Sequence, residues 1–318
     1  MITKSINRAI IELQKENVIA IPTETVYGLA ANAFSETAVQ KIFSLKKRPL
    51  HNPLIVHIAS LEDLSKIALN IPDKAFQLAN KFWPGPLTMI LDKHPDVPSI
   101  VTAGKEKVAV RIPNHSVTLE LLCQLSFPLA APSANPFGSI SPTCAQHVLD
   151  YFKNDLEVIL DGGSCESGIE STIIGFENNE PIIYRLGALT IEAIEKEVGP
   201  LRFILKNDKS PVAPGMLSRH YAPKTETFLT NDIKSLIKSF PDKKIGVLVF
   251  SKSIKDIQIV HSEILSVEGK LEEAAKNLYA ALHRLDEKEL DIIISEIMPD
   301  NGLGKAINDR LQRAIKKS

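Results

Sequence analysis

The sequence predicts an α/β protein of two domains: a large domain with a mixed twisted sheet and flanking helices, and a small doubly wound, Rossmann-like C-terminal domain. Over residues 1–204, short apolar runs alternate with segments of helical periodicity. Residues 205–227 are polar and proline-rich without periodicity, which is typical of a linker. A second alternation fills residues 228–318. We therefore expect two folded units joined by this linker.

The elements follow from apolar spacing and from turn residues. Ser35 is expected to cap a helix that runs to about Lys46. Further helices are expected at 6–13, 60–70, 72–82, 116–125, 143–152, 190–198, 270–285 and 302–315. Strands are expected at 18–21, 53–58, 87–91, 108–112, 128–131, 157–160, 171–176, 182–186, 244–250 and 291–297.

Composition limits the classes of function. The net charge is −1, so no overall basic field attracts nucleic acid or an anionic membrane. Three cysteines without a C-x-x-C pair argue against a disulfide framework or a structural zinc site and fit a reducing compartment. Charged residues interrupt the first apolar stretch, unlike a signal peptide, and no apolar run is long enough to span a bilayer. We expect a cytoplasmic protein.

Several common catalytic and nucleotide-binding motifs are absent. The sequence has no G-x-x-x-x-G-K-[ST], G-x-G-x-x-G, H-E-x-x-H or G-x-S-x-G. Residues 302–306, GLGKA, lack the upstream glycine and the following Ser or Thr of a phosphate loop, and we interpret them as a turn at a helix start. If the protein binds phosphate, residues outside these motifs must bind it.

One candidate is SLKKRPLHNPLIVHI at 44–58, where cations at a helix end precede a proline turn and a strand. Lys46 and Arg48 could simply complement the negative end of the helix dipole. Asn52 and His57 favour an anion-binding site instead, because polar side chains beside these cations would converge on an anion.

A second candidate is the loop PLAAPSANPFGSISPT at 128–143. Ser133 and Asn135 leave a strand between Pro132 and Pro136, which fix the backbone around them. Prolines reduce the freedom lost on binding, so the loop suits a preorganised polar site. Ser141 could instead cap the next helix.

Two further segments and two arginines complete the set. In IPTETVYGLAANA at 21–33, a buried strand is followed by hydroxyl residues that include Thr25. Taken by itself, this segment could be an ordinary turn. In DGGSCESGIESTIIGF, glycines precede Ser171. Arg111 and Arg185 stand in otherwise apolar strands, where each could bind a carboxylate or phosphate or form a structural ion pair.

Taken together and in this order, IPTETVYGLAA, LKKRPLHNPLIVHI, FWPGPLT, VAVRIP, APSAN and GIESTI closely resemble the YrdC-like threonylcarbamoyl-AMP synthases. APGMLSRHYAP at 213–223 and GLGKAINDRLQRA at 302–314 are similar to the linker and C-terminal domain of the long form of this family. The resemblance covers nearly the whole chain and implies a YrdC-like catalytic domain at 1–204, a lid-like linker at 205–227 and a C-terminal domain at 228–318.

The resemblance implies a nucleotidyltransferase that makes threonylcarbamoyl-AMP and pyrophosphate from L-threonine, bicarbonate and ATP. The product would serve downstream proteins that transfer the threonylcarbamoyl group to tRNA, and direct tRNA binding stays open. The implied catalytic cluster is Lys46, Arg48, Ser133 and Asn135. The implied ATP-binding residues are Arg48, Asn52, Ser133, Ser141, Arg185 and Tyr221. The implied threonine-binding residues are Thr25, His57, Arg111, Ala131 and Ser171.

The implied chemistry explains why no nucleophile motif is present. A carbamate made from threonine and bicarbonate would attack the α-phosphate in line, which requires alignment and charge neutralisation rather than a covalent intermediate. Mg²⁺ would accompany ATP, and no residue is assigned as general base. The reactive intermediates need protection from water, so we expect Arg219, His220 and Tyr221 to lie in a lid. Lys107 stands where family members often carry threonine before VAVR, so a nucleotide contact at this position is not assigned. Leu217 and Ser218 replace a Lys-Tyr pair that is frequent in the family's linker.

Two other functions are alternatives. A YrdC-like concave surface could bind double-stranded RNA or a ribosome, although the near-neutral charge counts against it. Carbamoyl transfer in hydrogenase maturation also uses such a domain, but it would need zinc-finger cysteines and further domains that this sequence lacks.

Overall fold

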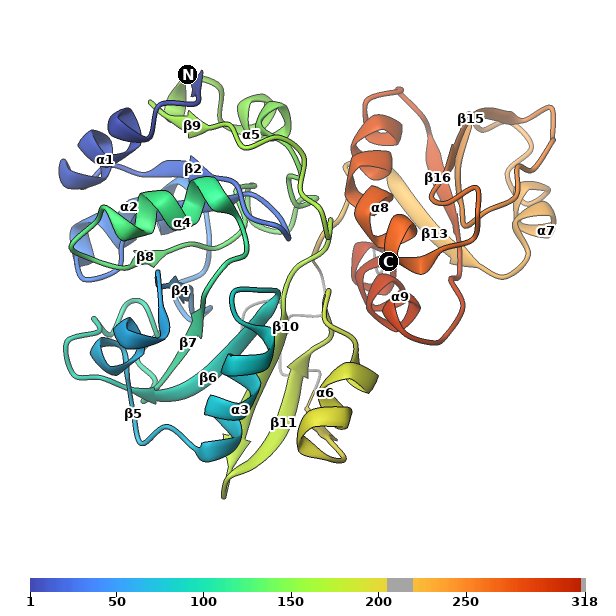
Figure 1. Ribbon diagram of the computed structural model, residues 1–318. Helices are drawn as coiled ribbons and strands as arrows, with labels where there is room; N and C mark the ends of the chain where they lie inside the picture. The colour runs from blue at the N-terminus through green and yellow to red at the C-terminus, as the bar shows by residue number, and fades with distance from the viewer. Residues whose placement is uncertain (205–219, 316–318) are drawn as a thin grey trace.

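The computed structural model describes residues 1–204 and 220–315, which form two domains side by side (Figure 1). The N-terminal domain contains a mixed sheet with the order β1-β9-β2-β3-β8-β4-β7-β6-β10-β11-β12, and β5 pairs with β6. Parallel pairs such as β4/β7 and β6/β10 alternate with antiparallel pairs such as β6/β7 and β10/β11. The predicted large mixed sheet is confirmed.

The strands of this sheet are mostly short. They are β1 (Ile2–Thr3), β2 (Ile19–Ile21), β3 (Gly28–Asn32), β4 (Ile55–His57), β5 (Ala68–Leu69), β6 (Leu87–Lys93), β7 (Lys107–Arg111), β8 (Leu129–Ala130), β9 (Ile159–Leu160), β10 (Thr172–Glu177), β11 (Glu180–Arg185) and β12 (Arg202–Phe203).

Helices cover the sheet. They are α1 (Ile6–Gln14), α2 (Glu36–Lys46), α3 (Asp73–Phe82), α4 (Ser116–Cys123), α5 (Ala145–Phe152) and α6 (Ile191–Val198), with short 3₁₀ turns η1 (Leu61–Lys66) and η2 (Lys153–Asp155). Ser35 caps α2 as predicted, because its Oγ accepts a hydrogen bond from Ala38 N at 3.1 Å.

One prediction of local structure was wrong, and one strand was not predicted. The helix expected at 60–70 is the 3₁₀ turn η1 followed by β5; Leu61, Leu64 and Ile67 recur every three residues, which matches the 3₁₀ period. Residues 28–32, for which no element was predicted, form β3 at the middle of the sheet between β2 and β8. Their Gly-Leu-Ala-Ala-Asn sequence has weak strand propensity, so pairing with both neighbours decides the conformation.

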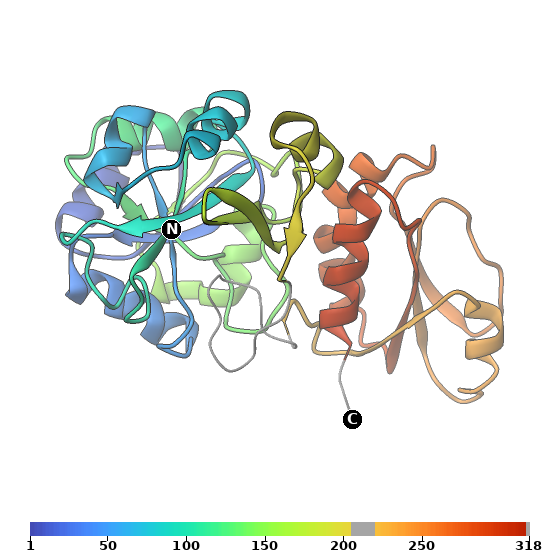
Figure 2. The ribbon, with the colours of Figure 1, turned by 90° about the horizontal axis from the view of Figure 1, so that it is seen from below.

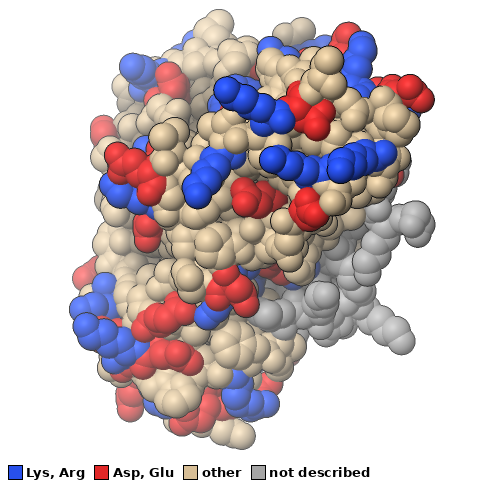
Figure 3. Space-filling view, turned by 90° about the vertical axis from the view of Figure 1, so that its right-hand side faces the viewer, with Lys and Arg blue, Asp and Glu red and all other residues tan. Residues whose placement is uncertain are grey.

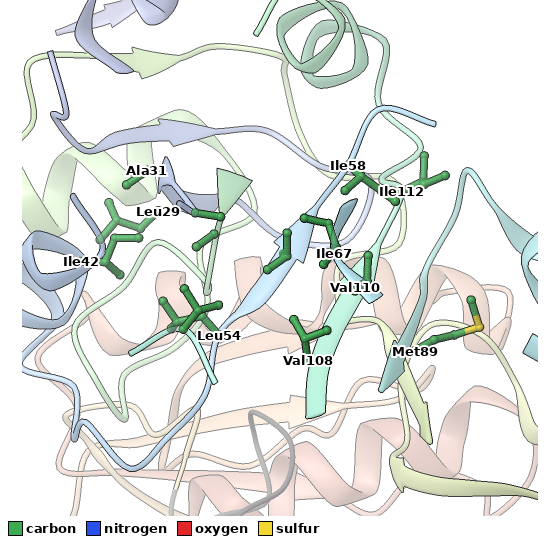
Figure 4. Packing of buried hydrophobic residues seen from close by; sticks show 14 of the residues in the cluster. Leu29, Ala31, Ile42, Leu54, Ile58, Ile67, Met89, Val108, Val110 and Ile112 are labelled. Carbon is green, nitrogen blue, oxygen red and sulfur yellow. The ribbon is translucent and has the colours of Figure 1, made fainter. Parts of the chain in front are cut away.

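The main core fills one face of this sheet. Leu29 and Ala31 of β3 and Val108 and Val110 of β7 lie in it, while the intervening residues belong to clusters on the other face. Figure 4 shows these side chains together with Ile42 of α2 and others from neighbouring strands. Both faces of the central strands are therefore buried, and a one-residue slip in register would move every apolar side chain to the wrong layer.

The C-terminal domain is a parallel sheet with the order β13-β16-β14-β15. Its strands are β13 (Glu226–Thr230), β14 (Ile245–Val249), β15 (Ile259–Ile264) and β16 (Ile292–Glu296), and its helices are α7 (Ile233–Ile237), α8 (Leu271–Asp286) and α9 (Leu303–Ala314). Figures 1 and 2 show α8 and α9 on the sheet face toward the N-terminal domain and α7 on the opposite face. This arrangement confirms the predicted small doubly wound domain. Strand β13 begins at Glu226, inside the segment 205–227 that was expected to be a linker.

The two domains share an apolar cluster. Val26, Ile140 and Ile169 of the N-terminal domain pack with residues of α8 and α9, among them Leu278 and Ile307. Gly168 permits the close approach, because a Cβ there would lie 2.4 Å from the Lys276 Cα of α8. Helix α8 therefore contacts the loop that precedes β10.

Helix length and the charges on one face bear on two classes of partner. Among residues 1–204 and 220–315, no helix is both long and apolar enough to cross a bilayer. On the face shown in Figure 3, basic and acidic side chains are intermingled rather than gathered into a patch of one sign. This face therefore lacks the basic patch expected where a module binds double-stranded RNA.

Two stacked histidines at the domain interface predict a pH dependence of stability. The rings of His147 on α5 and His283 on α8 lie 3.9 Å apart, and a His283 ring nitrogen, Nε2, lies 3.2 Å from Ser141 O. Burial, reinforced by His147, lowers the pKa of His283 from 6.5 to about 3. The unfolded chain therefore binds a proton below about pH 6.5 that the folded chain does not, so stability is lost as the pH falls through this range.

Replacing His283 by glutamine is expected to make this acid-side loss less steep. The slope of the unfolding free energy against pH should fall by up to about 1.4 kcal/mol per pH unit between roughly pH 6 and pH 4. Denaturant unfolding at several pH values measures it, and the same substitution at the exposed His51 is the control. Identical slopes for the wild type and His283→Gln would contradict the prediction.

Candidate active site

A cleft lies where segments from distant parts of the chain meet. Its lining includes the C-terminal residues of β4, β7 and β11, the residue before β10, the start of the proline loop, and residues 220–221. Most predicted site residues line it: Thr25, Arg48, His57, Arg111, Ala131, Ser133, Ser171, Arg185 and Tyr221. Lys46, Asn52, Asn135 and Ser141 do not, and each is buried beside the cleft or the loop.

Arg111 and His57 form one side of the cleft. They are partners in the register of the parallel strands β4 and β7, so both side chains leave the same sheet face. Arg111 Nε donates to Gly85 O at 3.1 Å, and Nη1 donates to Thr25 Oγ1 at 2.9 Å. Its Nη2 lies 2.5 Å from Glu24 Oε2 without hydrogen-bonding alignment. Arg111 is thus both a structural ion-pair partner and a cation at the cleft.

His57 is a neutral imidazole at this site. Burial, with a smaller contribution from Arg111, lowers the pKa of His57 from 6.5 to about 3. Its Nδ1 is buried without a hydrogen-bond partner among the described residues. Burying a ring nitrogen without a hydrogen-bond partner costs free energy of folding. This nitrogen is therefore available to a ligand that enters the cleft.

The proline loop is tied to the start of β3. Leu29 N donates to Pro132 O and Ala134 N donates to Tyr27 O, each at 2.7 Å. Asn135 is buried, and its Nδ2 donates to Pro136 O and Ser139 O at 2.9 Å. These bonds hold Ser133 at the cleft and fix Asn135 in the body of the loop.

Lys46 anchors the same loop from α2. Its buried Nζ donates to Ser133 O at 2.6 Å and to Asn135 O at 2.5 Å. Burial, with Arg48 nearby, holds the pKa of Lys46 well below its usual value. In this structure the amine therefore binds the loop backbone, and its contact with phosphate stays a prediction.

Arg48 reaches the cleft from the turn after α2. Its Nε donates to Asn52 O at 3.1 Å and its Nη2 to Pro53 O at 2.8 Å. Burial lowers the pKa of Arg48 to about 9. The Asn52 side chain is fully buried, and its amide has no partner among the described residues.

Arg185, at the end of β11, and Ser171, directly before β10, lie together at the cleft. Arg185 Nε and Nη2 donate to Ser171 O at 3.1 and 2.9 Å, and Nη2 also lies 3.0 Å from Ser171 Oγ. Gly187 allows this approach, because a Cβ there would lie 2.3 Å from the carbonyl carbon of Ser171. Burial lowers the pKa of Arg185.

Ser141 does not cap the next helix, which was the alternative to a place in the ATP-binding set. The N-cap of α5 is Cys144, and Ser141 Oγ instead donates to Glu170 Oε1 at 2.6 Å. Glu170 lines the cleft but is absent from the predicted site. An acidic residue inside the glycine-rich, apolar GIEST segment was the signal that could have indicated it.

Residues 220–222 contact both the proline loop at 128–143 and helix α9. Ala222 N donates to Gly138 O at 2.8 Å, and His220 N donates to Arg313 O at 3.1 Å. Tyr221 adopts φ 63°, and its ring lies 4.2 Å from that of His220. Arg219, Leu217 and Ser218 lie outside the described residues, so the lid remains a prediction.

Comparisons with known proteins identify the family. A Sua5/YciO/YrdC family model, described as telomere recombination, matches residues 12–187. A second model, the C-terminal domain of threonylcarbamoyl-AMP synthase, matches residues 189–315. This chain belongs to the threonylcarbamoyl-AMP synthases.

Similar proteins span almost the same length. The threonylcarbamoyl-AMP synthase of Pyrococcus abyssi is 42% identical over 316 residues, covering 95% of this chain and 91% of that protein. The Bacillus subtilis synthase is 40% identical over 312 residues, covering 95% and 90%. The crystal structure of P. abyssi Sua5 complexed with L-threonine superposes with a TM-score of 0.92 at 41% identity, covering 97% and 93% of the two chains.

The side chains around the synthase cleft determine how a metal ion could be held there. No group of three or more metal-ligating side chains occurs in residues 1–204 and 220–315. Glu170, the acidic residue in the cleft lining, already accepts from Ser141, Tyr279 and Arg310. Mg²⁺ would fit here only as a companion of the nucleotide, held by phosphate oxygens and water.

Lys107, flagged in the sequence for its departure from other synthases, lies away from the cleft. It begins β7, at the opposite end from Arg111, and its Nζ lies 2.5 Å from Asp92 Oδ1 on β6. In this structure Lys107 therefore supports the sheet and does not line the cleft.

Proposed function

We propose that this synthase forms threonylcarbamoyl-AMP and pyrophosphate from L-threonine, bicarbonate and ATP in the cleft described above. One observation carries the proposal: a single cleft joins the Arg111–His57 side to a second pair of cations, Arg48 and Arg185. The first side suits an amino acid with a side-chain hydroxyl, and the second suits a nucleotide phosphate.

The amino-acid half rests on Arg111, His57 and Thr25. Arg111 would take the threonine carboxylate, for which a guanidinium offers paired donors. Neutral His57 would accept a hydrogen bond from the threonine hydroxyl or amine at its Nδ1. The Ala131 backbone, Thr25 and the Ser171 hydroxyl would complete the polar contacts.

The nucleotide half rests on Arg48, Arg185, Ser133 and Tyr221. Both guanidinium groups are buried, so their interaction with phosphate charge is screened little by solvent. Four buried residues beside the cleft would fix the turn after α2 and the loop at 128–143: Lys46, Asn52, Asn135 and Ser141. Mg²⁺ bound with ATP would neutralise further phosphate charge.

The chemistry needs two steps with balanced atoms. The threonine amine and bicarbonate give a carbamate with loss of water. A carbamate oxygen then attacks the α-phosphorus, and pyrophosphate leaves with the electron pair of the broken P–O bond. The protein aligns the reactants and offsets charge, which accounts for a cleft without a covalent nucleophile.

Pyrophosphate release by the full chain tests the proposal. With ATP, Mg²⁺ and bicarbonate, release should require L-threonine and should be much slower with L-serine, which lacks the methyl group. Omitting bicarbonate should abolish it. Folded protein that binds ATP but shows no threonine-dependent release would contradict this function and favour the RNA-binding alternative. The product is expected to be consumed by proteins that modify tRNA.

A further inference from the structure

A buried carboxylate joins the cleft to the C-terminal domain. Glu170, the residue before Ser171, accepts from Tyr279 OH at 2.9 Å and from Arg310 Nε at 2.9 Å. Both donors belong to the C-terminal domain, on α8 and α9. Burial opposes ionisation of Glu170, but Arg310 and Arg185 together with hydrogen bonds from Ser141 and Arg310 keep the pKa of the carboxyl low. Glu170 is therefore a paired anion, and it is held from both domains.

Arg310 holds a second strand end as well. Its Nη2 donates to Leu186 O at 2.7 Å, and Leu186 directly follows Arg185 of β11. Its guanidinium also lies 5.2 Å from the centre of the Tyr221 ring. One fully buried side chain thus contacts Glu170, two residues before β10, Leu186, directly after β11, and the ring of Tyr221 in the cleft lining.

These contacts lead directly to predicted substrate-binding groups. Ala188 N donates to Glu170 O at 2.9 Å, so the two strand ends are also joined by backbone. Arg185 in turn donates to the carbonyl and hydroxyl of Ser171. A shift of Glu170 or Leu186 would therefore move Ser171 and Arg185 together.

We propose that Arg310 and Tyr279 are positioning residues for catalysis: from the C-terminal domain they hold Ser171 and Arg185 in the geometry that binds threonine and ATP. This inference rests on the proposed function. It assigns the C-terminal domain a part in building the cleft.

Docking of the domains does not depend on this network alone. The apolar cluster between Val26, Ile140, Ile169 and the helices α8 and α9 remains without it. So does the partly exposed ion pair between Lys305 of α9 and Glu192 of α6, at 3.0 Å. Conservative changes in the network should therefore alter cleft geometry while the domains stay docked.

Two variants of the full chain test the role. Arg310→Lys keeps the charge, but one amine cannot reproduce the planar fork that reaches both Glu170 and Leu186. Tyr279→Phe removes one donor and keeps the ring. Lys305→Met, on the same helix and at the same interface, is the matched control.

In pyrophosphate release, Arg310→Lys should raise the KM for both L-threonine and ATP by about tenfold, and Tyr279→Phe by about threefold, since lost hydrogen bonds to charged groups have effects of this order. Lys305→Met should stay within about twofold of wild type. A residue that only stabilised the fold would lower the melting temperature and leave the KM values of the folded enzyme unchanged. Unchanged KM values in both folded variants would overturn the proposal.

Amide hydrogen exchange provides a measurement that needs no activity. Exchange at Thr172 and Ala188, whose amides donate to Pro86 O and Glu170 O, should rise several-fold in Arg310→Lys and stay unchanged in Lys305→Met. If wild type releases no pyrophosphate, the proposed function fails, while this exchange still decides whether Arg310 holds the strand ends. Equal exchange in Arg310→Lys and wild type would refute the positioning role.

Discussion

Replacing Arg111 by alanine is expected to raise the KM for L-threonine by roughly 100-fold, because the variant loses paired, charge-assisted hydrogen bonds to the substrate carboxylate. The KM for ATP should change much less, since Arg48 and Arg185 carry the nucleotide side. Threonine- and ATP-dependence of pyrophosphate release measure the two constants. Equal changes in both would remove the role assigned to Arg111.

The ion pair with Glu24 requires a second variant. Arg111→Ala leaves a buried carboxylate without its partner, which is itself strongly destabilising. Combining it with Glu24→Gln removes that unpaired charge, so the double variant separates folding from binding. If the double variant folds with wild-type stability and still shows a large, selective rise in the KM for L-threonine, the effect belongs to substrate binding. Recovery of the wild-type KM would assign it to folding.

Replacing Lys46 by alanine is expected to lower kcat by roughly 100-fold. The substitution leaves the carbonyls of Ser133 and Asn135 without their buried donor, which costs about 1–3 kcal/mol for each group and releases the loop that presents Ser133. Steady-state pyrophosphate release with saturating substrates measures it. Lys47→Ala, at the exposed neighbouring position, is the control. A Lys46→Ala variant with wild-type kcat would contradict the anchoring role.

The pH profile distinguishes anchoring by Lys46 from charge neutralisation. Burial lowers the pKa of the amine, so it loses its proton at a lower pH than an exposed lysine does. A neutral amine still has two N–H donors for the two carbonyls, whereas its positive charge is gone. We therefore expect kcat to persist as the pH rises through this transition. A decline that Lys46→Met abolishes would show that the charge itself acts on phosphate.

Local sequence determined most of the elements and much of the site. Apolar periodicity predicted β6, β7, α3 and α9, because long amphipathic or apolar segments have few alternatives. The site motifs were visible because hydroxyl, amide and cationic residues follow buried strands. That Thr25, His57, Arg111 and Ser171 form one group was implied by the family resemblance, and all four line the cleft.

Only the tertiary structure decided what these residues contact. β3 forms because β2 and β8 pair with its alanine-rich backbone, and Lys46 contacts carbonyls 87 and 89 residues away in the chain. Glu170 and Arg310 are separated by 140 residues and belong to different domains. No local propensity specifies such pairs; they form because burial of a charge requires a partner, and the packing of the two domains determines which partner is within reach.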